Sequence, residues 1–367
     1  MGKGYRLINV LDLYKGHSID TKNLSRLELS IADFTKKKVK VGDIFFTRSS
    51  ITPDGIAFCN FCNEEADDIT FDGHVMKLTP NPKIINPAFL RLYCISKVAR
   101  KHLVSSAKQT TMTTIGQSDI AQLPVILPPL TEQSDIAASI SDTDALIAKL
   151  ERLIDKKRNI KQGVMQELLT GKRRLPGFSG GWEIKKLGDL FDVKDGTHQT
   201  PRYVDEGVPF YSVESVTRDD FENTKYISNT EHKLLTKNFR IEEGDILMTR
   251  IGSIGDCKLI TWKPNASFYV SLALLKPKNK EASRYISHFS KTSFFKKELE
   301  DRSLQWAVPK KINLGEISKV RVYLPVDTKE QVAIATILSD MDTAIEKLES
   351  QLTKYQNLKQ GMMQTLL

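Results

Sequence analysis

The sequence predicts an α+β protein with two domains that are related by a pseudo-twofold axis and joined by two long antiparallel coiled-coil helices. The chain has 367 residues, which is more than one ordinary hydrophobic core comfortably fills. A long segment of helical character occurs twice without a gap. The segment before each copy carries the same short strand motif. Duplication of one domain together with its helix explains all three observations.

The helical repeat begins at Glu132-Gln133 in its first copy and at Glu330-Gln331 in its second. Identical residues occupy matching positions along both copies, among them Ile136 and Ile334, Asp144 and Asp342, Lys161 and Lys359, and Gly163 and Gly361. Such gapless self-similarity indicates that the element was duplicated.

Apolar residues in each copy follow the alternating spacing of a coiled-coil seam, which is more regular in the second copy. A stripe this narrow requires a partner, and the simplest partner is the other copy, antiparallel to it about the pseudo-twofold axis. The residues expected at this partner-helix interface are Ile147, Leu150, Ile154 and Gly163 of the first copy and Ile345, Leu348, Leu352 and Gly361 of the second. The alternative is a helical hairpin with no role in spacing.

Each copy also contains a cluster of helix-capping residues, at 141–144 and at 339–342. Hydroxyl and carboxylate groups favour helix N-termini. We therefore expect a short helix, a break, and then a long helix of roughly 28 residues in each copy.

Gly163 and Gly361 are unusual because glycine costs a helix interior about 1 kcal/mol. Close approach of a partner, or a kink, would explain them.

The globular segments repeat as well. Gly42–Arg48 resembles Gly244–Arg250, each a turn, a buried strand and a polar exit, and Gly4–Val10 matches Gly207–Val213. We divide the chain into a first domain at 1–130, a first helical segment at 131–170, a linker at 171–181, a second domain at 182–327 and a second helical segment at 328–367. The first domain looks N-terminally short, because the counterpart of Trp182–Phe191 would precede Met1.

The composition favours a polyanionic partner and a reducing compartment. Lys and Arg outnumber Asp and Glu by 54 to 45, which gives a net charge of +9. The sequence has no apolar run of about 18 residues and no signal peptide, so we expect a cytoplasmic protein without membrane contact. Four scattered cysteines do not suggest a disulfide framework. Cys59 and Cys62 have zinc-knuckle spacing with His74 nearby, but buried thiols are the preferred interpretation, and we expect no metal.

The sequence supplies no catalytic motif. It contains no Asn/Asp-Pro-Pro-Tyr/Phe motif of amino methyltransferases, no glycine-rich nucleotide loop and no convincing nuclease pattern. We therefore expect a chain that catalyses nothing alone.

The order of domain, long helix, domain, long helix resembles the specificity subunits of type I restriction-modification systems. The stretch from Glu132-Gln133 to Thr170-Gly171 is similar to the central conserved region of that family, as are Leu175–Phe178, Trp182 and Lys186–Gly188. The segment Asp195–Pro201 and the two Gly-Asp-Ile…Thr-Arg motifs are similar to those of its target-recognition domains.

This resemblance implies a non-catalytic reader of double-stranded DNA. Each target-recognition domain would read one half of a bipartite sequence, and the helices would set the gap between the halves. Two modification (methyltransferase) subunits, which bind S-adenosylmethionine, would dock on the helices, and restriction (motor-nuclease) subunits that use ATP and Mg would be optional further partners. The complex would be a DNA adenine methyltransferase or type I site-specific endonuclease, with no cofactor in this chain.

Donor-rich positions supply the candidate DNA contacts. Arg48 and Arg250 leave buried strands where a guanidinium can pair with guanine or clamp a phosphate; a structural salt bridge or loop anchor is the alternative for each. The lesser candidates are Thr47, Ser49, Thr249 and Ser253 in the same loops, Thr197, His198, Gln199 and Arg202 in a donor-dense loop, and Lys310 and Lys311 after Gln305-Trp306. For the donor-dense loop the alternative is a locally satisfied turn, and for the lysines a solvated charge pair.

Two other functions remain open at this point. One is a coiled-coil protein-assembly scaffold without sequence-specific DNA binding, which salt-dependent DNA affinity would exclude. The other is a fused nuclease or methyltransferase with an unrecognised site, which would modify DNA with no partner present.

Overall fold

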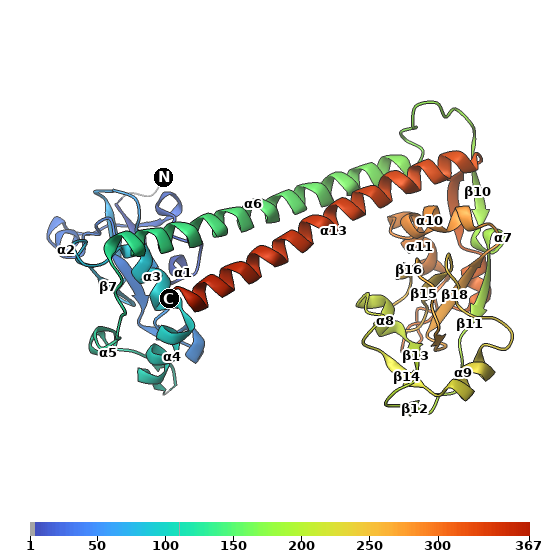
Figure 1. Cartoon of the computed structure of the whole chain (residues 1–367). Helices are drawn as coiled ribbons and strands as arrows, with labels where there is room; N and C mark the ends of the chain where they lie inside the picture. The colour runs from blue at the N-terminus through green and yellow to red at the C-terminus, as the bar shows by residue number, and fades with distance from the viewer. Residues whose placement is uncertain (1–3, 110) are drawn as a thin grey trace. The chain divides into compact units, whose positions relative to one another are not determined.

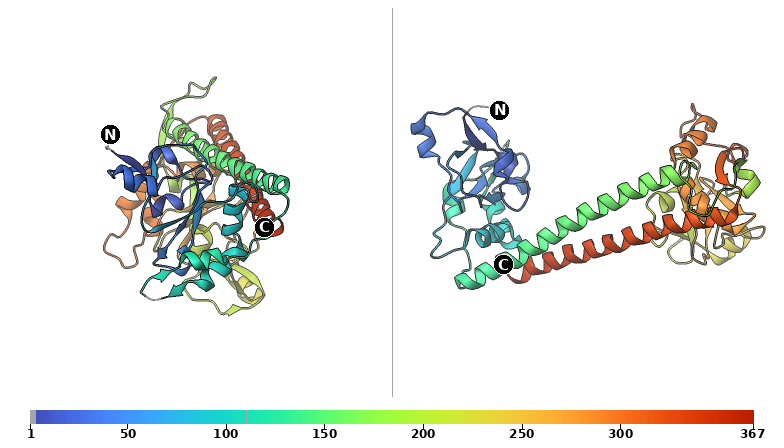
Figure 2. Two further views of the ribbon diagram at one scale, coloured as in Figure 1. Left: turned by 90° about the vertical axis from the view of Figure 1, so that its left-hand side faces the viewer. Right: turned by 90° about the horizontal axis from the view of Figure 1, so that it is seen from above.

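The computed structural model describes residues 4–109 and 111–367 (Figures 1 and 2). The chain divides into two compact units. Unit 1 comprises residues 1–153 and 348–367, and unit 2 comprises residues 154–347. Each unit holds one globular domain and part of each of two long helices, so each is described by itself.

The strands of unit 1 form three small sheets. In chain order they are β1 Tyr5–Ile8, β2 Ser25–Leu27, β3 Ile44–Thr47, β4 Ser49–Ser50, β5 Cys59–Phe61, β6 Ile69–Phe71, β7 Val75–Leu78, β8 Lys108–Gln109 and β9 Thr113–Thr114. Strand β1 lies between antiparallel β2 and parallel β6, and β3 lies between β5 and β7, both antiparallel. Strand β9 lies between β4 and β8.

Short helices complete the domain of unit 1. They are α1 Val10–Leu13, α2 Ile31–Lys36, α3 Pro87–Ile95, α4 Lys97–Ser106 and α5 Gln117–Ala121. Local sequence signals explain the start of α3, because the Asn86 side chain accepts hydrogen bonds from the N–H groups of Ala88 and Phe89 and a proline stands at the first helical position. Two turns of 3-10 helix cover Thr21–Asn23 and Pro53–Gly55.

Unit 2 repeats this plan with more strands. In chain order they are β10 Trp182–Lys186, β11 Phe191–Asp195, β12 Tyr203–Val204, β13 Val208–Tyr211, β14 Lys225–Ile227, β15 Ile246–Thr249, β16 Cys257–Leu259, β17 Ser267–Phe268, β18 Leu272–Pro277 and β19 Arg321–Pro325. Its short helices are α7 Leu187–Leu190, α8 Val213–Thr217, α9 Asn229–Leu235, α10 Lys280–Phe289, α11 Ser293–Arg302 and α12 Leu314–Ser318.

The central strands of the two domains have matching neighbours. Strand β13 lies between antiparallel β14 and parallel β17, as β1 lies between β2 and β6. Strand β15 lies between β16 and β18, as β3 lies between β5 and β7. The duplicated motifs at Gly42–Arg48 and Gly244–Arg250 thus form matching central strands, which confirms the expected internal duplication.

The two long helices are α6, Leu130–Leu168, and α13, Thr328–Thr365. Both are unbroken, so the predicted break near the serine and aspartate cluster is wrong. In α6 the cluster has other partners: the Thr143 hydroxyl donates to the Ser139 carbonyl one turn earlier, and the buried Asp144 carboxylate contacts Lys359 of α13. Because tertiary contacts satisfy these side chains, the helix has no need to begin there.

In each unit, the start of one long helix contacts the end of the other, so the helices are antiparallel as predicted. In unit 1, Lys359 Nζ lies 2.6 Å from Asp144 Oδ1. In unit 2, Lys161 pairs with Asp342. These two ion pairs join the same matching positions of the repeat with the helices exchanged, as a pseudo-twofold axis requires.

The predicted interface residues divide into two groups. Leu150, Ile154 and Ile345 are buried, and Ile147, Leu348 and Leu352 are half-buried. Gly163 and Gly361 are exposed, and a Cβ atom added at either would meet no described atom within 4 Å. The expectation of a close approach at these glycines is therefore wrong within this chain, and both helices pass through them without interruption.

Each domain carries its core beneath the helix ends. In unit 2, Leu168 at the end of α6, Leu169 directly after it, and Ile334 and Leu338 of α13 join a cluster that contains Tyr285, Phe289 and Phe295. Burial of each such side chain contributes about 1.5–3 kcal/mol. None of the helices in the described part of the chain is both long and apolar enough to cross a membrane.

Candidate nucleic-acid interface

The threonines that end the two central strands are structural. Thr249 is fully buried, and its hydroxyl oxygen accepts the Asp256 N–H at 3.0 Å. The Thr47 hydroxyl, equally buried, donates to the Gly55 carbonyl at 2.9 Å. Both side chains close the loop that follows their strand. The prediction that they contact DNA is therefore wrong, because neither reaches the surface.

Arg250 is a buried anchor and not an exposed reader. Its side chain is only 8% exposed. The guanidinium donates to the Val270 carbonyl at 2.8 Å, to the Ile312 carbonyl at 3.3 Å and to both carboxylate oxygens of Asp195 at 2.9 and 3.1 Å. Arg250 was the strongest candidate for a DNA contact, with a loop anchor as the alternative. The structure supports the loop anchor, because the N–H donors of Arg250 already bind groups of the protein.

Arg48 occupies the matching position in unit 1 but is exposed. Its backbone repeats the hydrogen bonds of Arg250: the N–H donates to His74, and the carbonyl accepts from Ile115. The guanidinium, in contrast, has no ion-pair partner among the described residues, so it is available to a phosphate or a base. The neighbouring Ser49 is half-buried and pairs with Thr114 through β4 and β9.

In the donor-dense loop after β11, the residues next to the strand are held by backbone contacts, and the side chains further along are exposed to solvent. A Cβ atom at Gly196 would lie 2.6 Å from backbone atoms of Phe268 and Tyr269, so only glycine permits this approach. Thr197 is half-buried and its N–H donates to the Phe268 carbonyl. The remaining three candidates, His198, Gln199 and Arg202, are exposed. His198 Nε2 lies 2.7 Å from Asp195, which also holds Arg250.

The basic segment before α12 lies beside the loop that follows β15. Lys311 forms backbone bridges to Ile251 and to Leu304, and the Gly252 N–H donates to the Lys310 carbonyl. The Lys311 side chain is exposed, whereas Lys310 forms an ion pair with Glu300. Ser253 is exposed but bonded to Asp256.

Two exposed residues of this segment were not among the DNA contacts predicted from the sequence. Trp306 is 98% exposed and Val308 is 99% exposed. The sequence offered one signal, a tryptophan four residues before a pair of lysines. Through Asp195 and Ile312, Arg250 ties the donor-dense loop and this segment to the exit of β15. The structure therefore gathers three loops of unit 2 around one buried arginine.

A polar pocket of about 540 Å³ opens beside these loops in unit 2. Its lining includes Tyr203, Arg218, Asn223 and Lys225, with Glu214 and Asp220 as negative members. The Lys225 ammonium lies 4.5 Å from the centre of the Tyr203 ring. No sequence pattern indicated this pocket, because its residues come from separated loops.

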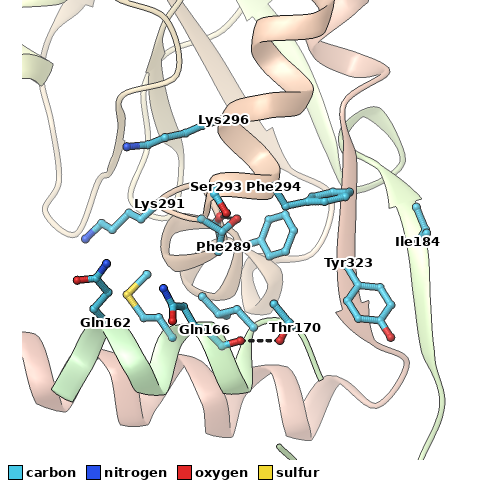
Figure 3. Close-up of a pocket in the computed structure, with 13 residues that line it drawn as sticks. Gln162, Gln166, Thr170, Ile184, Phe289, Lys291, Ser293, Phe294, Lys296 and Tyr323 are labelled. Atoms are coloured by element: carbon cyan, nitrogen blue, oxygen red, sulfur yellow. Dashed lines mark hydrogen bonds between the residues drawn. The ribbon is translucent and has the colours of Figure 1, made fainter. Parts of the chain in front are cut away.

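A second pocket of unit 2, of about 470 Å³, is mainly apolar (Figure 3). Gln162 and Gln166 of α6 lie on one side of it, and Phe289 and Phe294 lie opposite (Figure 3). Met165 and Leu169 also line the pocket. Ile184, Tyr323, Lys291 and Lys296 complete the lining. Such a pocket next to an α-helix suits an apolar side chain of a partner.

A buried histidine of α10 contacts the long helix α13 in unit 2. His288 Nε2 lies 3.0 Å from the Ser339 hydroxyl, and Nδ1 lies 3.9 Å from Asp342. Burial, together with the smaller effect of the nearby Lys291 ammonium, lowers the pKa of the His288 imidazole to about 4. The imidazole is therefore neutral at neutral pH, although a carboxylate lies close to it.

The thiols of unit 1 are buried, as expected. Cys59 and Cys94 lie in one hydrophobic cluster and Cys62 in another. His74 is exposed at a turn, where it contacts Asp72. Across residues 4–109 and 111–367, no three His, Cys, Asp or Glu side chains are grouped to hold a metal ion.

Comparison with known proteins decides the family. The model of the type I restriction modification DNA specificity domain matches this chain twice, over residues 18–161 and 179–354. The chain belongs to this family. The two matches correspond to the duplicated plan of the two units.

Relatives and solved structures agree with this family. A putative type I restriction enzyme MjaX specificity subunit from Methanocaldococcus jannaschii is 25% identical over 381 residues, covering 99% of this chain and 86% of the relative. The type I restriction enzyme EcoBI specificity subunit from Escherichia coli is 26% identical over 175 residues, covering 46% of this chain and 35% of the relative. The crystal structure of the S subunit of a type I restriction-modification system from M. genitalium has a TM-score of 0.63 at 16% identity, covering 100% of this chain and 90% of that structure, and supports the fold.

Proposed function

We propose that this chain is the DNA sequence-specificity subunit of a type I restriction-modification complex. The observation that carries the proposal is the presence of two copies of the specificity domain, one in each unit, whose central strands have matching neighbours. Two similar but unequal readers suit a bipartite target with two different half-sites. Each domain reads one half, and the chain itself catalyses nothing.

The loops around Arg250 form the reading surface of unit 2. Gln199 and Arg202 carry donors at the tip of one loop, and Lys311 and Trp306 lie on the neighbouring segment. A glutamine pairs with adenine and an arginine with guanine, whereas a lysine mostly contacts phosphate. In unit 1, Arg48 and Ser49 occupy the equivalent surface. The net charge of +9 supports attraction to the DNA backbone.

The two long helices set the distance between the half-sites and provide the docking surface for two modification subunits. The apolar pocket beside the end of α6 offers one anchoring point (Figure 3). S-adenosylmethionine would bind to the modification subunits, and ATP with Mg to motor-nuclease subunits where these join. The complex would act in the cytoplasm as a DNA adenine methyltransferase or type I endonuclease.

Substitution of the reading loops of one unit tests this division of labour. With the modification subunits present, Gln199→Ala and Arg202→Ala should relax base choice in one half-site and leave the other half-site and the gap unchanged. Lys36→Ala, at an exposed position on α2 of unit 1, serves as the control that changes neither. Changes in both half-sites, or DNA affinity that does not depend on salt, would favour the scaffold function.

A further inference from the structure

A buried arginine of unit 1 has no partner for its charge. Arg91, on α3, is 6% exposed, and Arg250 of unit 2 is similarly buried. Arg250 donates to two carbonyl groups and a carboxylate, whereas the Arg91 side chain forms no hydrogen bond or ion pair within the described ranges 4–109 and 111–367. Burial lowers the pKa of the Arg91 guanidinium, but an arginine remains charged in proteins. A buried charge is unfavourable unless an opposite charge lies beside it.

Arg91 lines a small cavity of about 80 Å³ in unit 1. This volume corresponds to about three water molecules, or to one group of the size of a phosphate. The polar residues of the lining come from α3, α6 and two loops, and they are His17, Ser18, Asn63, Arg91, Ser141 and Asp144. The charged arginine therefore borders a space that is large enough for a small ligand.

The carboxylate of this cavity is already paired with other groups. Asp144 is the one acidic residue among the described residues of the lining. Its Oδ1 lies 2.6 Å from Lys359 Nζ, and its Oδ2 lies 3.0 Å from His17 Nδ1. Burial lowers the pKa of His17, and the charges of Lys359 and Arg91 act in the same direction. With His17 neutral, two cations face one carboxylate, so the surroundings of the cavity carry an excess of positive charge.

Three neutral donors of the cavity also have no partner in the protein. The Ser18 and Ser141 hydroxyls and the Asn63 amide form no hydrogen bond with another residue in the part of the chain that the structure describes. Water molecules in the cavity would accept hydrogen bonds from these groups and from Arg91, but they would leave the positive charge unbalanced. An anion with several acceptor oxygens meets both requirements.

We propose that this cavity is a binding site for a small tetrahedral oxyanion of the phosphate class. The Arg91 guanidinium binds two of its oxygens, an arrangement that suits the planar fork of arginine donors. The hydroxyl and amide groups of the lining donate to the remaining oxygens. Asp144 stays paired with Lys359 and His17, so its charge is compensated beside the anion. This ligand site goes beyond the reading of DNA and does not depend on it.

The position of the site gives the anion a structural effect. In unit 1, Leu92 of α3 and Ala137 of α6 belong to one hydrophobic cluster, and Met362 of α13 packs against it. A bound anion adds a polar contact between α3 and α6 at the edge of this cluster. Because a ligand that binds only the folded chain raises its stability, occupancy should hold the domain of unit 1 more firmly to its long helices.

Titration of the full chain with inorganic phosphate, without DNA and at constant ionic strength, tests the proposal. Isothermal titration calorimetry should show saturable binding to one site. The unfolding temperature should rise with phosphate concentration and give the same dissociation constant. Chloride at the same ionic strength should give neither result, because it lacks the oxygens that the guanidinium binds. An equal effect of chloride would overturn the proposal, since it would show general screening of charge.

Variants of Arg91 locate the site. Arg91→Met should abolish phosphate binding, and in phosphate-free buffer it should unfold at the same or a higher temperature, because it buries no unpaired charge. Arg91→Lys keeps the charge, so it carries the test if the methionine variant does not fold. It should bind phosphate at least about tenfold more weakly, because the bidentate contact is lost. Arg152→Met, at an exposed position of α6 in unit 1, is the control and should bind phosphate normally.

Mixed-sequence duplex DNA, added to the phosphate-saturated chain, identifies the source of the oxyanion. Unchanged phosphate binding identifies the free anion, and competitive release of phosphate identifies a phosphate of the DNA backbone. Absence of saturable phosphate binding, or equal phosphate affinity of the wild type and both Arg91 variants, would overturn the proposal. Because the titrations that decide this contain no DNA, their failure leaves the proposed reading function to be judged separately.

Discussion

Arg250 donates two hydrogen bonds to the carboxylate of Asp195, at 2.9 and 3.1 Å, and in doing so joins the exit of β15 to the end of β11. The pair lies where three loops of unit 2 meet. A charge-assisted pair in a mostly buried position fixes geometry more effectively than an exposed one. The loops that present Gln199, Arg202 and Lys311 therefore depend on a residue that is itself hidden.

Arg250→Ala should destabilise unit 2 by about 3–5 kcal/mol, since it leaves Asp195 and two carbonyl groups without their donor. Chemical denaturation followed by a probe in unit 2 measures this change. Arg202→Ala is the matched control, because its side chain is exposed, and it should leave the free energy of unfolding almost unchanged. A stable Arg250→Ala protein that merely relaxed one base position would show instead that the arginine reads DNA.

Lys311→Ala should weaken binding of the assembled complex to all DNA sequences alike and lower the slope of log affinity against log salt by about 1. The reason is that an exposed lysine contacts phosphate without sequence preference. Titration of labelled DNA at several salt concentrations measures the slope. A change confined to one target sequence would contradict a phosphate contact.

Trp306→Ala should reduce affinity for the specific DNA by about 1 kcal/mol or more, because truncation of an aromatic anchor in an interface typically costs that much. The ring is 98% exposed, so its removal costs no folded-state packing and the unfolding temperature should stay the same. Equal DNA affinity of the wild type and Trp306→Ala would show that the loop that carries Trp306 lies away from the DNA.

Lys359→Ala should destabilise unit 1 by about 3–5 kcal/mol, because the Asp144 carboxylate, whose side chain is 4% exposed, then loses its lysine partner at a buried position. Lys161→Ala should cost less, since the Asp342 carboxylate that it leaves unpaired is 33% exposed and solvent screens its charge. A double-mutant cycle of Asp144 and Lys359 isolates the coupling between them. Equal losses for the two lysine variants would contradict this ranking.

Protonation of His288 should destabilise unit 2 at acid pH. Its folded-state pKa of about 4 lies below the unfolded value of about 6.5. A lowered histidine pKa means that the unfolded state binds the proton more tightly, so the stabilising contribution is present above about pH 6.5 and is lost as the pH falls towards 4. The loss amounts to about 3 kcal/mol at most. Denaturation of the wild type and of His288→Gln at several pH values measures the difference between their free energies of unfolding. This difference should shrink as the pH falls from about 6.5 to about 4. A constant difference would contradict a buried neutral imidazole.

The duplicated architecture could be predicted because its signals are local and repeated. The seam of Leu150, Ile154 and Ile345 and the paired strands after Gly42 and Gly244 are visible as residue patterns. The capping cluster at 141–144 led to the wrong prediction of a helix break, because the Asp144 carboxylate has a partner, Lys359, that is remote in sequence. Helix-capping statistics describe only local alternatives.

The candidate site was harder to predict for the same reason. Arg250 looked like an exposed arginine at a strand exit, and its partner Asp195 lies on a strand far away in the sequence. Arg48 has the same local pattern and is exposed, so the pattern alone cannot separate the two. Trp306 was noticed only as a neighbour of lysines, since exposure is a property of the fold.

The most direct test of the central claim is a methylation map of DNA from cells that express this chain with its modification subunit. The proposed function predicts methylated adenines in a split motif, with two different half-sites and a fixed gap. Exchange of the unit 2 reading loops should then change one half-site alone. Methylation with no split motif, or a motif that does not depend on this chain, would contradict the claim that the chain specifies the target.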